Sequence, residues 1–415
     1  MTAGRLADDC FVHDRDRMRH QEVLDLIRER LTVVASTGTV KLSEAGGRIL
    51  ATDVRAPRPV PAHDNAAVDG YAFASAAGGV TLPVSLRIVA GDAPPPLPPG
   101  TAARIFTGAP MPDGADRVAM QEDAERRPGG VALPALRPGA NRRRAGEDVA
   151  EGKVVASAGD VLDARALAAI ASTGTERVEV RRRLRVGLVS NGDELLLPGE
   201  PFRHGAVYDS NRTMLASMVR DWGVQLVDLG LRGDDGETIT ATMADAAGRC
   251  DLVLTSGGAS KGEEDHVRDA LDSLGSRHLW QIAVKPGRPM MLGTIGQCVV
   301  AGLPGNPVAA FVCALLYLRP MLRVLGGANW VEPVRFAVPA AFSIDSKPDR
   351  REFLRGRVVG SGADARAEKF GRDGSGLISG LRWATGLIEV AEDTTEVRAG
   401  DPVSFIPFSE FGLRS

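Results

Sequence analysis

Acidic loops follow three apolar segments in the part of the chain from residue 184 onward. Asp193 and Glu194 follow LRVGLVS, Asp234 follows VQLVDLGL, and Asp265 lies in the GGASKGEEDH loop after DLVLTS. Carboxylates next to a phosphate repel it unless a cation lies between them, and Mg²⁺ held by one or two carboxylates plus phosphate oxygens resolves this repulsion. These loops therefore predict a site for a phosphate group and Mg²⁺.

Other residues near these loops suit an anion. The paired glycines of TSGGAS let the backbone approach closely, and its serines can donate hydroxyl hydrogen bonds. The LPGNP turn places Asn306 before a helix whose free N–H groups attract an oxyanion. Lys285 and Arg288 flank a Pro-Gly turn. The predicted phosphate-binding loops comprise Ser256, Gly257, Gly258, Ser260, Pro304, Gly305, Asn306 and Pro307.

Each feature taken alone also has a structural explanation. A TSGG turn can be a tight connection, and LPGNP can be merely a helix start. Asp234 or Asp235 can belong to a solvated turn or cap a helix, and Asp265 can complement a helix dipole. Lys285 and Arg288 can be ordinary exposed cations. Convergence of all these loops on one edge favours the functional interpretation.

The elements between these loops explain why they should converge. From residue 184 onward, apolar strands alternate regularly with helices, which is typical of a parallel sheet covered on both faces. In such sheets ligands bind outside the carboxyl ends of the strands. The sequence therefore predicts a doubly wound parallel α/β domain over 184–327, with all of the loops at one edge.

The rest of the chain has a different character. Residues 18–35 have helical periodicity, and GDVLDARALAAIASTG reads as a helix with a glycine stop. Pro- and Gly-rich short strands in between predict a small β domain, and the tail predicts a small β barrel or sandwich. The predicted domains besides 184–327 are an N-terminal linker domain of 15–55 with 146–183, an inserted β-rich domain of 56–145, and a C-terminal β barrel of 328–415.

Composition narrows the class of protein. A net charge of −3 over 415 residues argues against general nucleic-acid or membrane-surface binding. The four cysteines form no CxxC pair, the start is too polar for a secretory signal, and the most apolar stretch is interrupted by PGNP. We expect a cytoplasmic protein. No Ser-His-Asp or metal-ligating histidine spacing is evident, so catalysis by a bound cation and positioning is expected.

Two upstream stretches stay ambiguous on spacing alone. DNAAVDGYAF (64–73) offers polar turn residues followed by aromatic anchors. NRRRAGED (141–148) offers three arginines that can grip a phosphate, although such a run is usually a solvated face.

Taken together, the motifs resemble those of the molybdopterin molybdenumtransferases, bacterial relatives of the gephyrin E domain. The resemblance runs from GRILATDV (47–54) into the β tail. It rests on DNAAVDGYAF, IFTGAPMP, NRRRAGED, VSNGDEL, YDSNR, TSGGASKGEEDHV, KPGRP and GLPGNP, which occur in the family's order.

The resemblance implies an elongated homodimer of four-domain subunits with the active site at the dimer interface. It also implies a reaction. Adenylylated molybdopterin and molybdate are the substrates, the pyrophosphate link is cleaved with Mg²⁺, AMP is released, and molybdenum enters the dithiolene. Molybdopterin adenylyltransferase and maturation factors of molybdenum enzymes are the implied partners, with no nucleic acid and no membrane.

The resemblance assigns roles to individual residues. Arg143 and Ser375 match substrate-binding positions, and Glu194, Asp234 and Asp265 are the implied metal ligands. The implied catalytic residues are Asp69, Thr107, Asp148, Glu194, Asp234, Asp265 and Lys285. One position departs from the pattern, because some family members have a lysine where this chain has Gln281. An amide can donate a hydrogen bond but brings no charge to an oxyanion.

Two other functions fit parts of the sequence. A molybdopterin adenylyltransferase uses a related α/β domain, although usually that domain alone. A non-catalytic cofactor carrier or scaffold could also be built on the same fold, as gephyrin is, although no long linker or second α/β domain supports this.

Overall fold

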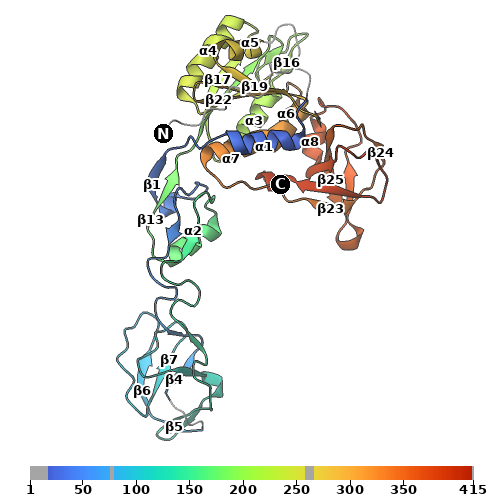
Figure 1. Ribbon diagram of the computed structural model, residues 1–415. Helices are drawn as coiled ribbons and strands as arrows, with labels where there is room; N and C mark the ends of the chain where they lie inside the picture. Colours follow the sequence, from blue (N-terminus) through green and yellow to red (C-terminus); the bar gives the residue numbers. More distant parts are fainter. Residues whose placement is uncertain (1–16, 75–78, 258–265, 414–415) are drawn as a thin grey trace. The chain divides into compact units, whose positions relative to one another are not determined.

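The computed structural model describes residues 17–74, 79–257 and 266–413 (Figure 1). The chain divides into two compact units. Unit 1 consists of Met1–Gly38 and Arg181–Ser415, and unit 2 consists of Thr39–Val180. We describe each unit by itself.

Unit 1 contains the predicted α/β domain, built on a six-stranded sheet. In spatial order its strands are β17 (Gln225–Arg232), β14 (Arg185–Asn191), β18 (Leu252–Ser256), β22 (Cys298–Leu303), β21 (Pro289–Ile295) and β19 (Ser276–Gln281). The first four strands are parallel, whereas β21 and β19 pair antiparallel. The sheet is therefore mixed, not fully parallel as expected. Only Gly296 and Gln297 separate β21 from β22, and so short a connection joins only antiparallel strands.

Both faces of this sheet are covered, as the apolar strands predict. Leu252 and Leu254 of β18 belong to one hydrophobic cluster, and Val253 between them belongs to another. This alternation follows from the period of two residues along a strand. Helices α4 (Gly236–Arg249) and α5 (His266–Leu274) supply buried residues to the second cluster, and α3 (Ser210–Asp221) to the first.

Aspartates begin two of these helices. The carboxylate of Asp209 accepts a hydrogen bond from the N–H of Arg212 (2.9 Å) at the start of α3. The letters SNRTM at the start of α3 favour Ser210 or Asn211 as the cap, but Asp209 before them takes that position. Asp235 accepts one from the N–H of Thr238 (2.8 Å) at the start of α4, so its structural interpretation as a helix cap is correct.

The helix that follows the LPGNP turn is long and irregular. It comprises α6 (Pro307–Cys313), a π-helical turn (Ala314–Leu318) and α7 (Arg319–Gly326). Pro320 lacks an N–H and its ring crowds the carbonyl of Leu316, and the π turn ends directly before this proline's turn of helix.

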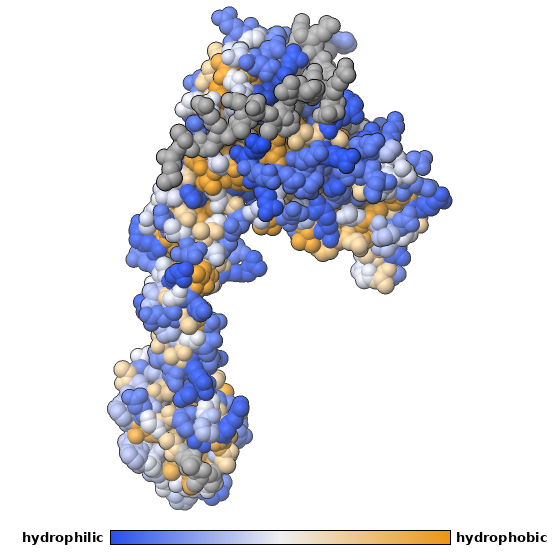
Figure 2. Space-filling view, in the orientation of Figure 1, coloured by the Kyte–Doolittle hydropathy of each residue, from blue (hydrophilic) through white to orange (hydrophobic). Residues whose placement is uncertain are grey.

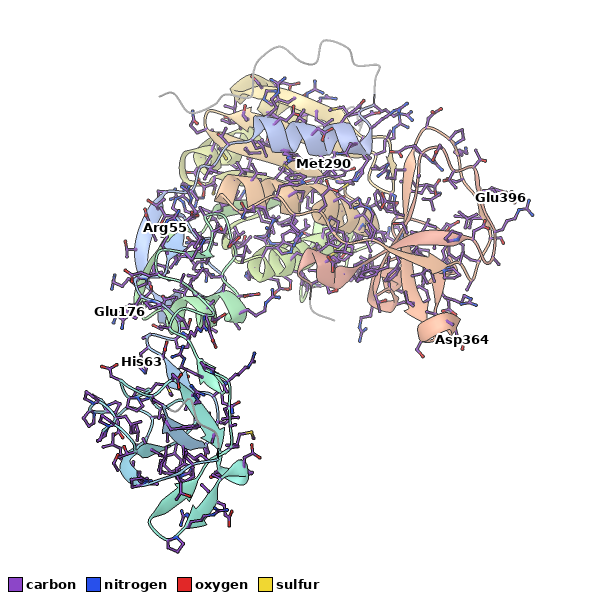
Figure 3. The ribbon with its side chains drawn as sticks, turned by 60° about the horizontal axis from the view of Figure 1, so that its bottom comes forward. Arg55, His63, Glu176, Met290, Asp364 and Glu396 are labelled. Atoms are coloured by element: carbon purple, nitrogen blue, oxygen red, sulfur yellow. The ribbon has the colours of Figure 1, made fainter. Side chains whose placement is uncertain are left out.

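The same segment, Pro307–Gly326, is long and apolar enough to cross a membrane on length and composition alone. However, 78% of its most apolar window is buried inside the protein, which is what a core helix shows. The visible face of the molecule is mostly hydrophilic, with apolar side chains in separate small areas (Figure 2). Figure 3 shows Met290, which is fully buried in the same core, beneath the surface helices.

The N-terminal helix α1 (His20–Arg30) packs in unit 1 through Val23 and Ile27. The predicted domain boundaries had placed it with the linker segments. Its buried His20 Nδ1 lies 2.8 Å from the Tyr317 hydroxyl of the π turn. Burial, together with the charges of Arg351 and Arg335, lowers the pKa of His20 to about 3, so the ring is neutral.

A small β barrel ends unit 1, as the sequence predicts. Its antiparallel strands run in the order β26, β25, β27, β29, β23, and a bridge between Ala340 and Ala367 joins the two ends. The short strand β20 (Val284–Lys285) of the α/β domain pairs in parallel with β25. The barrel elements are β23 (Phe336–Pro339), β25 (Arg351–Val359), β26 (Arg366–Lys369), β27 (Gly386–Val390), β29 (Pro402–Pro407), the pair β24 (Ile344–Asp345) with β28 (Glu396–Val397), and α8 (Ser379–Trp383).

Unit 2 holds two kinds of structure. Segments before and after the β-rich insertion share one hydrophobic cluster around Leu50, Ile170 and Val180. Helix α2 begins after Asp163 and is followed by Gly174 at φ +80, the predicted glycine stop. The elements of this part are β1 (Thr37–Lys41), β2 (Val54–Arg55), β12 (Val154–Ala156), α2 (Ala164–Ser172) and β13 (Arg177–Arg181).

The insertion itself is all β, as predicted. Tyr71 and Phe73 of β4 pack in one cluster and Ala72 between them in another, so β4 is buried on both faces. The strands are β3 (Asn65–Ala66), β4 (Gly70–Phe73), β5 (Thr81–Leu82), β6 (Val84–Ile88), β7 (Ala102–Ile105), β8 (Arg117–Met120), β9 (Glu125–Arg127), β10 (Gly130–Ala132) and β11 (Arg142–Arg143). They form a four-stranded sheet β6-β7-β4-β8, a three-stranded sheet β5-β10-β9 and a pair β3-β11.

Candidate functional site

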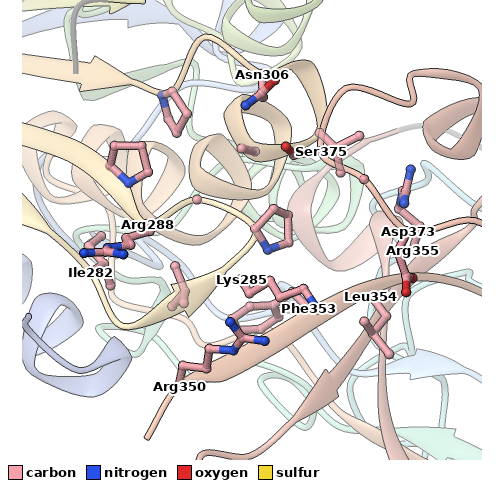
Figure 4. A pocket seen from close by; sticks show the side chains of 18 of the residues that line it. Ile282, Lys285, Arg288, Asn306, Arg350, Phe353, Leu354, Arg355, Asp373 and Ser375 are labelled. Atoms are coloured by element: carbon pink, nitrogen blue, oxygen red, sulfur yellow. The ribbon is translucent and has the colours of Figure 1, made fainter. Parts of the chain in front are cut away.

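A pocket of about 440 Å³ lies in unit 1 where the α/β domain meets the β barrel (Figure 4). Its walls come from the β19–β21 connection, the start of α6, strand β25 and the loop after β26. The parallel pairing of β20 with β25 brings the first and third of these together. The volume lies within the range of small-molecule sites.

The lining of the pocket is strongly cationic. Among the described residues that line it, Asp373 is the one acidic side chain. Six cationic side chains line the pocket: Arg17, Lys285, Arg288, Arg350, Arg355 and Lys369. Such a concentration of positive charge in a concave site favours an anionic ligand.

A buried carboxylate behind the wall fixes two of these cations. Glu352 is 3% exposed; its Oε2 lies 3.0 Å from Lys285 Nζ. Its Oε1 accepts hydrogen bonds from Arg350 Nε (3.1 Å) and Nη2 (2.8 Å). Burial alone would raise the pKa of the Glu352 carboxyl, but the hydrogen bonds from Lys285 and Arg350 hold it below its ordinary value. Glu352 is therefore ionised and orients both cations.

Neutral groups fix two more. Gln281 Oε1 accepts hydrogen bonds from Arg288 Nε (3.2 Å) and Nη2 (3.1 Å). The two terminal nitrogens of Arg355 donate to the carbonyls of Leu377 and Arg372, each at 2.9 Å. The position where some family members have lysine thus holds an arginine in place by an uncharged acceptor. Restrained cations of this kind are preorganised for a ligand.

Four of the predicted substrate residues line this pocket, namely Arg288, Pro304, Asn306 and Ser375. The carbonyl of Ser375 accepts a hydrogen bond from the N–H of Val308 (2.9 Å) in the first turn of α6. Asn306 occupies the N-cap position, but its side chain makes no capping hydrogen bond. The expected set of free N–H groups at this helix start is smaller than predicted, because Pro307 has none and that of Val308 is used.

The predicted glycine hinge is present at Gly257, whose φ is +96. Its N–H donates to the carbonyl of Leu303 (3.2 Å), and the close approach of an anion to this glycine stays a prediction. A Cβ added at Gly257 would lie 3.2 Å from the carbonyl oxygen of Asn191. Ser256 is buried at the end of β18. Gly258, Ser260 and Asp265 lie outside the described residues.

The carboxylates at the strand ends meet in part. Asp193 Oδ1 accepts from the N–H of Asp234 (3.0 Å), and Asp234 Oδ2 accepts from the N–H of Asp193 (3.3 Å). Glu194 is next to Asp193, and both residues follow β14. Asp234 follows β17, the strand that pairs with β14. In residues 17–74, 79–257 and 266–413 no three metal-ligating side chains gather in one group. The metal site predicted with Asp265 stays a prediction.

The predicted residues of unit 2 form their own arrangement. Asp69 Oδ1 accepts hydrogen bonds from the N–H (2.8 Å) and the hydroxyl (2.7 Å) of Thr107. These bonds, with a smaller effect of the Arg104 charge, hold the pKa of Asp69 below its ordinary value. Arg143 lies on β11, which pairs with β3 at Asn65. The DNAAVDGYAF and NRRRAGED stretches are thereby neighbours.

Asp148, which the resemblance names as catalytic, closes the NRRRAGED stretch. Its N–H donates to the carbonyl of Val60 (3.1 Å).

The residues missed from the sequence come mainly from the barrel. They are Arg350, Glu352, Arg355, Lys369 and Asp373. Charges two residues apart in DRREFLRGR could have indicated Arg350 and Glu352, because strand residues two apart share a face, but nothing local indicates which face meets Lys285.

Three family models match the chain. A MoeA N-terminal region (domain I and II) matches residues 18–174, a probable molybdopterin binding domain matches 169–324, and a MoeA C-terminal region (domain IV) matches 337–408.

Whole-chain relatives agree with these matches. A molybdopterin molybdenumtransferase of Haemophilus influenzae is 35% identical over 92% of this chain and 96% of its own. The molybdopterin molybdenumtransferase 2 of Mycobacterium tuberculosis is 38% identical over 87% of this chain and 93% of its own. A crystal structure of the molybdopterin biosynthesis MoeA protein from Pyrococcus horikoshii OT3 has a TM-score of 0.82 and 28% identity, covering 94% of this chain and 100% of its own.

Proposed function

Because the chain belongs to the molybdopterin molybdenumtransferase family, we propose that the cationic pocket of unit 1 receives the molybdate from which molybdenum is transferred. The enzyme acts in molybdenum cofactor biosynthesis by inserting molybdenum. The adenylyltransferase and the non-catalytic scaffold considered from the sequence are not favoured, since molybdenumtransferases match along most of this chain.

The single observation that supports the pocket assignment is its set of restrained cations. Molybdate is a compact doubly charged oxyanion without a hydrophobic part, so its binding depends on charge and hydrogen-bond donors. Lys285 and Arg288 can supply both from one side, and the Ser375 hydroxyl can donate from the other. Glu352 and Gln281 keep these cations in position before the ligand arrives.

The second substrate is adenylylated molybdopterin. Its pyrophosphate link would be bound at the carboxyl edge of the sheet, beside Asp193, Glu194 and Asp234. Carboxylate oxygens are the donors that Mg²⁺ takes, and Glu194, Asp234 and Asp265 would hold it there. When bound, Mg²⁺ supplies neutralisation of phosphate charge. Water or a molybdate oxygen would attack one phosphorus of the pyrophosphate. The P–O–P link would break, and AMP would be released.

The unit 2 residues are proposed to act on the same substrate from a second copy of the chain. Asp69 is ionised and fixed by Thr107 on one oxygen, which leaves its other oxygen for a substrate donor. Arg143 and Asp148 belong to the neighbouring stretch. We propose that the protein is a cytoplasmic homodimer. A molybdopterin adenylyltransferase would supply its substrate, and maturation factors of molybdenum enzymes would receive its product.

The test uses purified protein, adenylylated molybdopterin and Mg²⁺, with and without low micromolar molybdate. Release of AMP that depends on molybdate is the expected result. The Lys285→Ala variant should then need far more molybdate for the same rate, while the matched control Lys347→Ala, a cation that does not line the pocket, should behave like the wild type.

Two results would contradict the proposal. AMP release at the full rate without molybdate would remove the coupling to insertion. If the Lys285→Ala variant kept the wild-type dependence on molybdate, the assignment of molybdate binding to this pocket would be wrong. For the metal ligands, Asp265→Asn should abolish AMP release, and an unchanged rate would exclude Asp265.

A further inference from the structure

Asp373 sits among the cations of the pocket described above. Its Oδ1 lies 2.9 Å from Lys369 Nζ, and both residues line the pocket. The Lys369 side chain is 15% exposed whereas that of Asp373 is 75% exposed. The carboxylate thus approaches a mostly buried cation from the solvent side, which is the side from which a dissolved anion would enter.

More than one pocket cation acts on this carboxylate. The pKa of Asp373 lies below its ordinary value, and the hydrogen bond from Lys369 is the largest cause. The positive charges of Lys285 and Arg355 lower this pKa further. The three cations come from different walls, namely β26, β20 and β25. A single negative group that interacts with all three occupies a position that a bound oxyanion would share.

The two carboxylates near the pocket differ in one respect. Glu352 is 3% exposed and holds Lys285 and Arg350 from behind the wall, so it cannot leave without exposing a buried ion cluster. Asp373 is exposed, and exposed ion pairs contribute little to stability, so its bond to Lys369 can be exchanged for another at small cost.

The loop that carries Asp373 is suited to this exchange. Gly374 follows it at φ +132, a conformation that favours glycine. Ser375, the next residue, is anchored by its carbonyl to the N–H of Val308. Ser375, which would contact the substrate, is therefore fixed. Among the described residues, no hydrogen bond joins the neighbouring Asp373 side chain to the α/β domain.

We propose that Asp373 occupies the anion position of the pocket as an internal competitor, and that it selects for doubly charged oxyanions. A dianion gains about twice the Coulomb energy of a monoanion from the same cations. It can therefore displace a single carboxylate from Lys369, whereas chloride or a free carboxylate cannot. Asp373 is a specificity-determining residue in this scheme, and the inference rests on the proposed function of the pocket.

The test measures binding of molybdate alone by calorimetry to the wild type and to Asp373→Asn, which keeps the shape and removes the charge. The variant should bind molybdate about two- to fivefold more tightly, the size expected for loss of an exposed competing ion pair. Adding sodium chloride or sodium acetate to a low-salt buffer should weaken molybdate binding to the variant more than to the wild type, because either monoanion can enter the position that Asp373 has left.

Asp364→Asn is the matched control. This substitution removes the same charge from the same barrel. Asp364 lies at the turn between β25 and β26 (Figure 3) and does not line the pocket. This control should bind molybdate like the wild type in each of these buffers. Thermal unfolding of each variant checks that the fold is kept.

The outcomes separate this inference from the function on which it rests. If the wild type binds molybdate and Lys285→Ala weakens that binding, the pocket assignment stands. Equal or weaker binding by Asp373→Asn, or the same gain in Asp364→Asn, then overturns the competitor role alone. If the wild type does not bind molybdate, or Lys285→Ala binds it equally well, the pocket assignment itself fails.

Discussion

Lys285 and Glu352 are 67 residues apart in the chain, yet their side chains meet at 3.0 Å across the parallel pair β20–β25. This contact joins the α/β domain to the β barrel and at the same time turns an ammonium group toward the pocket. We expect Glu352→Ala to destabilise the protein by on the order of 2 kcal/mol, because it leaves two cations without their buried partner. Denaturant unfolding measures this change. A free energy of unfolding within error of the wild type would contradict it.

The same carboxylate should make stability depend on acid pH. The folded pKa of Glu352 lies below its ordinary value of 4.5, so the unfolded chain binds a proton before the folded one. The contribution is therefore present above pH 4.5 and is lost as pH falls through the folded pKa. Unfolding followed between pH 6 and pH 3 should show a shallower loss of stability for Glu352→Gln than for the wild type. Parallel curves would exclude this role.

Buried His20 should act over a neighbouring pH range. Its pKa is about 3 when folded and 6.5 ordinarily, so between these values the unfolded chain binds a proton that the folded chain does not. Stability should fall as pH drops through this window, by at most roughly 1.4 kcal/mol per pH unit. His20→Phe removes the titrating group, and its stability should depend less on pH there. An equal slope in both proteins would show that His20 is not the cause.

The Asp69–Thr107 pair should matter for turnover more than for folding. Thr107→Val keeps the volume and backbone hydrogen bond but removes the hydroxyl that Asp69 accepts from at 2.7 Å. We expect kcat/KM for AMP release to fall by roughly five- to tenfold, as for loss of one solvent-exposed hydrogen bond of ordinary strength. Thr107→Ser should recover most of the activity. A Thr107→Ser variant as impaired as Thr107→Val would indicate a packing effect instead.

Gly257 should be intolerant of substitution. Its φ of +96 disfavours any side chain, and an added Cβ would meet the carbonyl of Asn191 at 3.2 Å. Gly257→Ala should cost about 1–2 kcal/mol of stability and raise the KM for adenylylated molybdopterin. Gly248→Ala, in helix α4 with open space around its Cβ position, is the control and should be neutral or slightly stabilising. Equal effects at both positions would contradict this explanation.

Local sequence patterns predicted the elements of the α/β domain well, because fully apolar strands and amphipathic helices differ over a few residues. Its last two strands were missed as a hairpin. CVVAGL was predicted as a strand and PMMLGTI was not, although only two residues join them and so short a connection requires an antiparallel pair. The helix starts were found, but the choice of Asp209 over Ser210 as the cap depends on backbone geometry that letters do not reveal.

The residues that could be predicted from spacing lie in loops and turns of the α/β domain, among them Lys285 and Arg288 at the Pro-Gly turn. Asp193, Asp234 and Gly257 were located in this way. The barrel half of the pocket was not, because Arg350, Glu352 and Lys369 meet the α/β domain through tertiary pairing that leaves no periodic signal. Likewise nothing in the spacing of Asp69 and Thr107 indicates their hydrogen bonds, and the family resemblance alone singled them out.

The π-helical turn at Ala314–Leu318 limits what chain length this helix can have. A π turn has i→i+5 hydrogen bonds and so holds one residue more than the α-helical turn it replaces. Removing one residue from the π turn would restore a regular α-helix, whereas removing or adding one elsewhere between Pro307 and Gly326 would rotate α7 by about 100° relative to α6. Met321 and Leu325, now buried in the core, would then point elsewhere, and Tyr317 would lose its place beside His20. Single-residue insertions and deletions should therefore be excluded from α6 and α7, and a single deletion is compatible with the core only within the π turn.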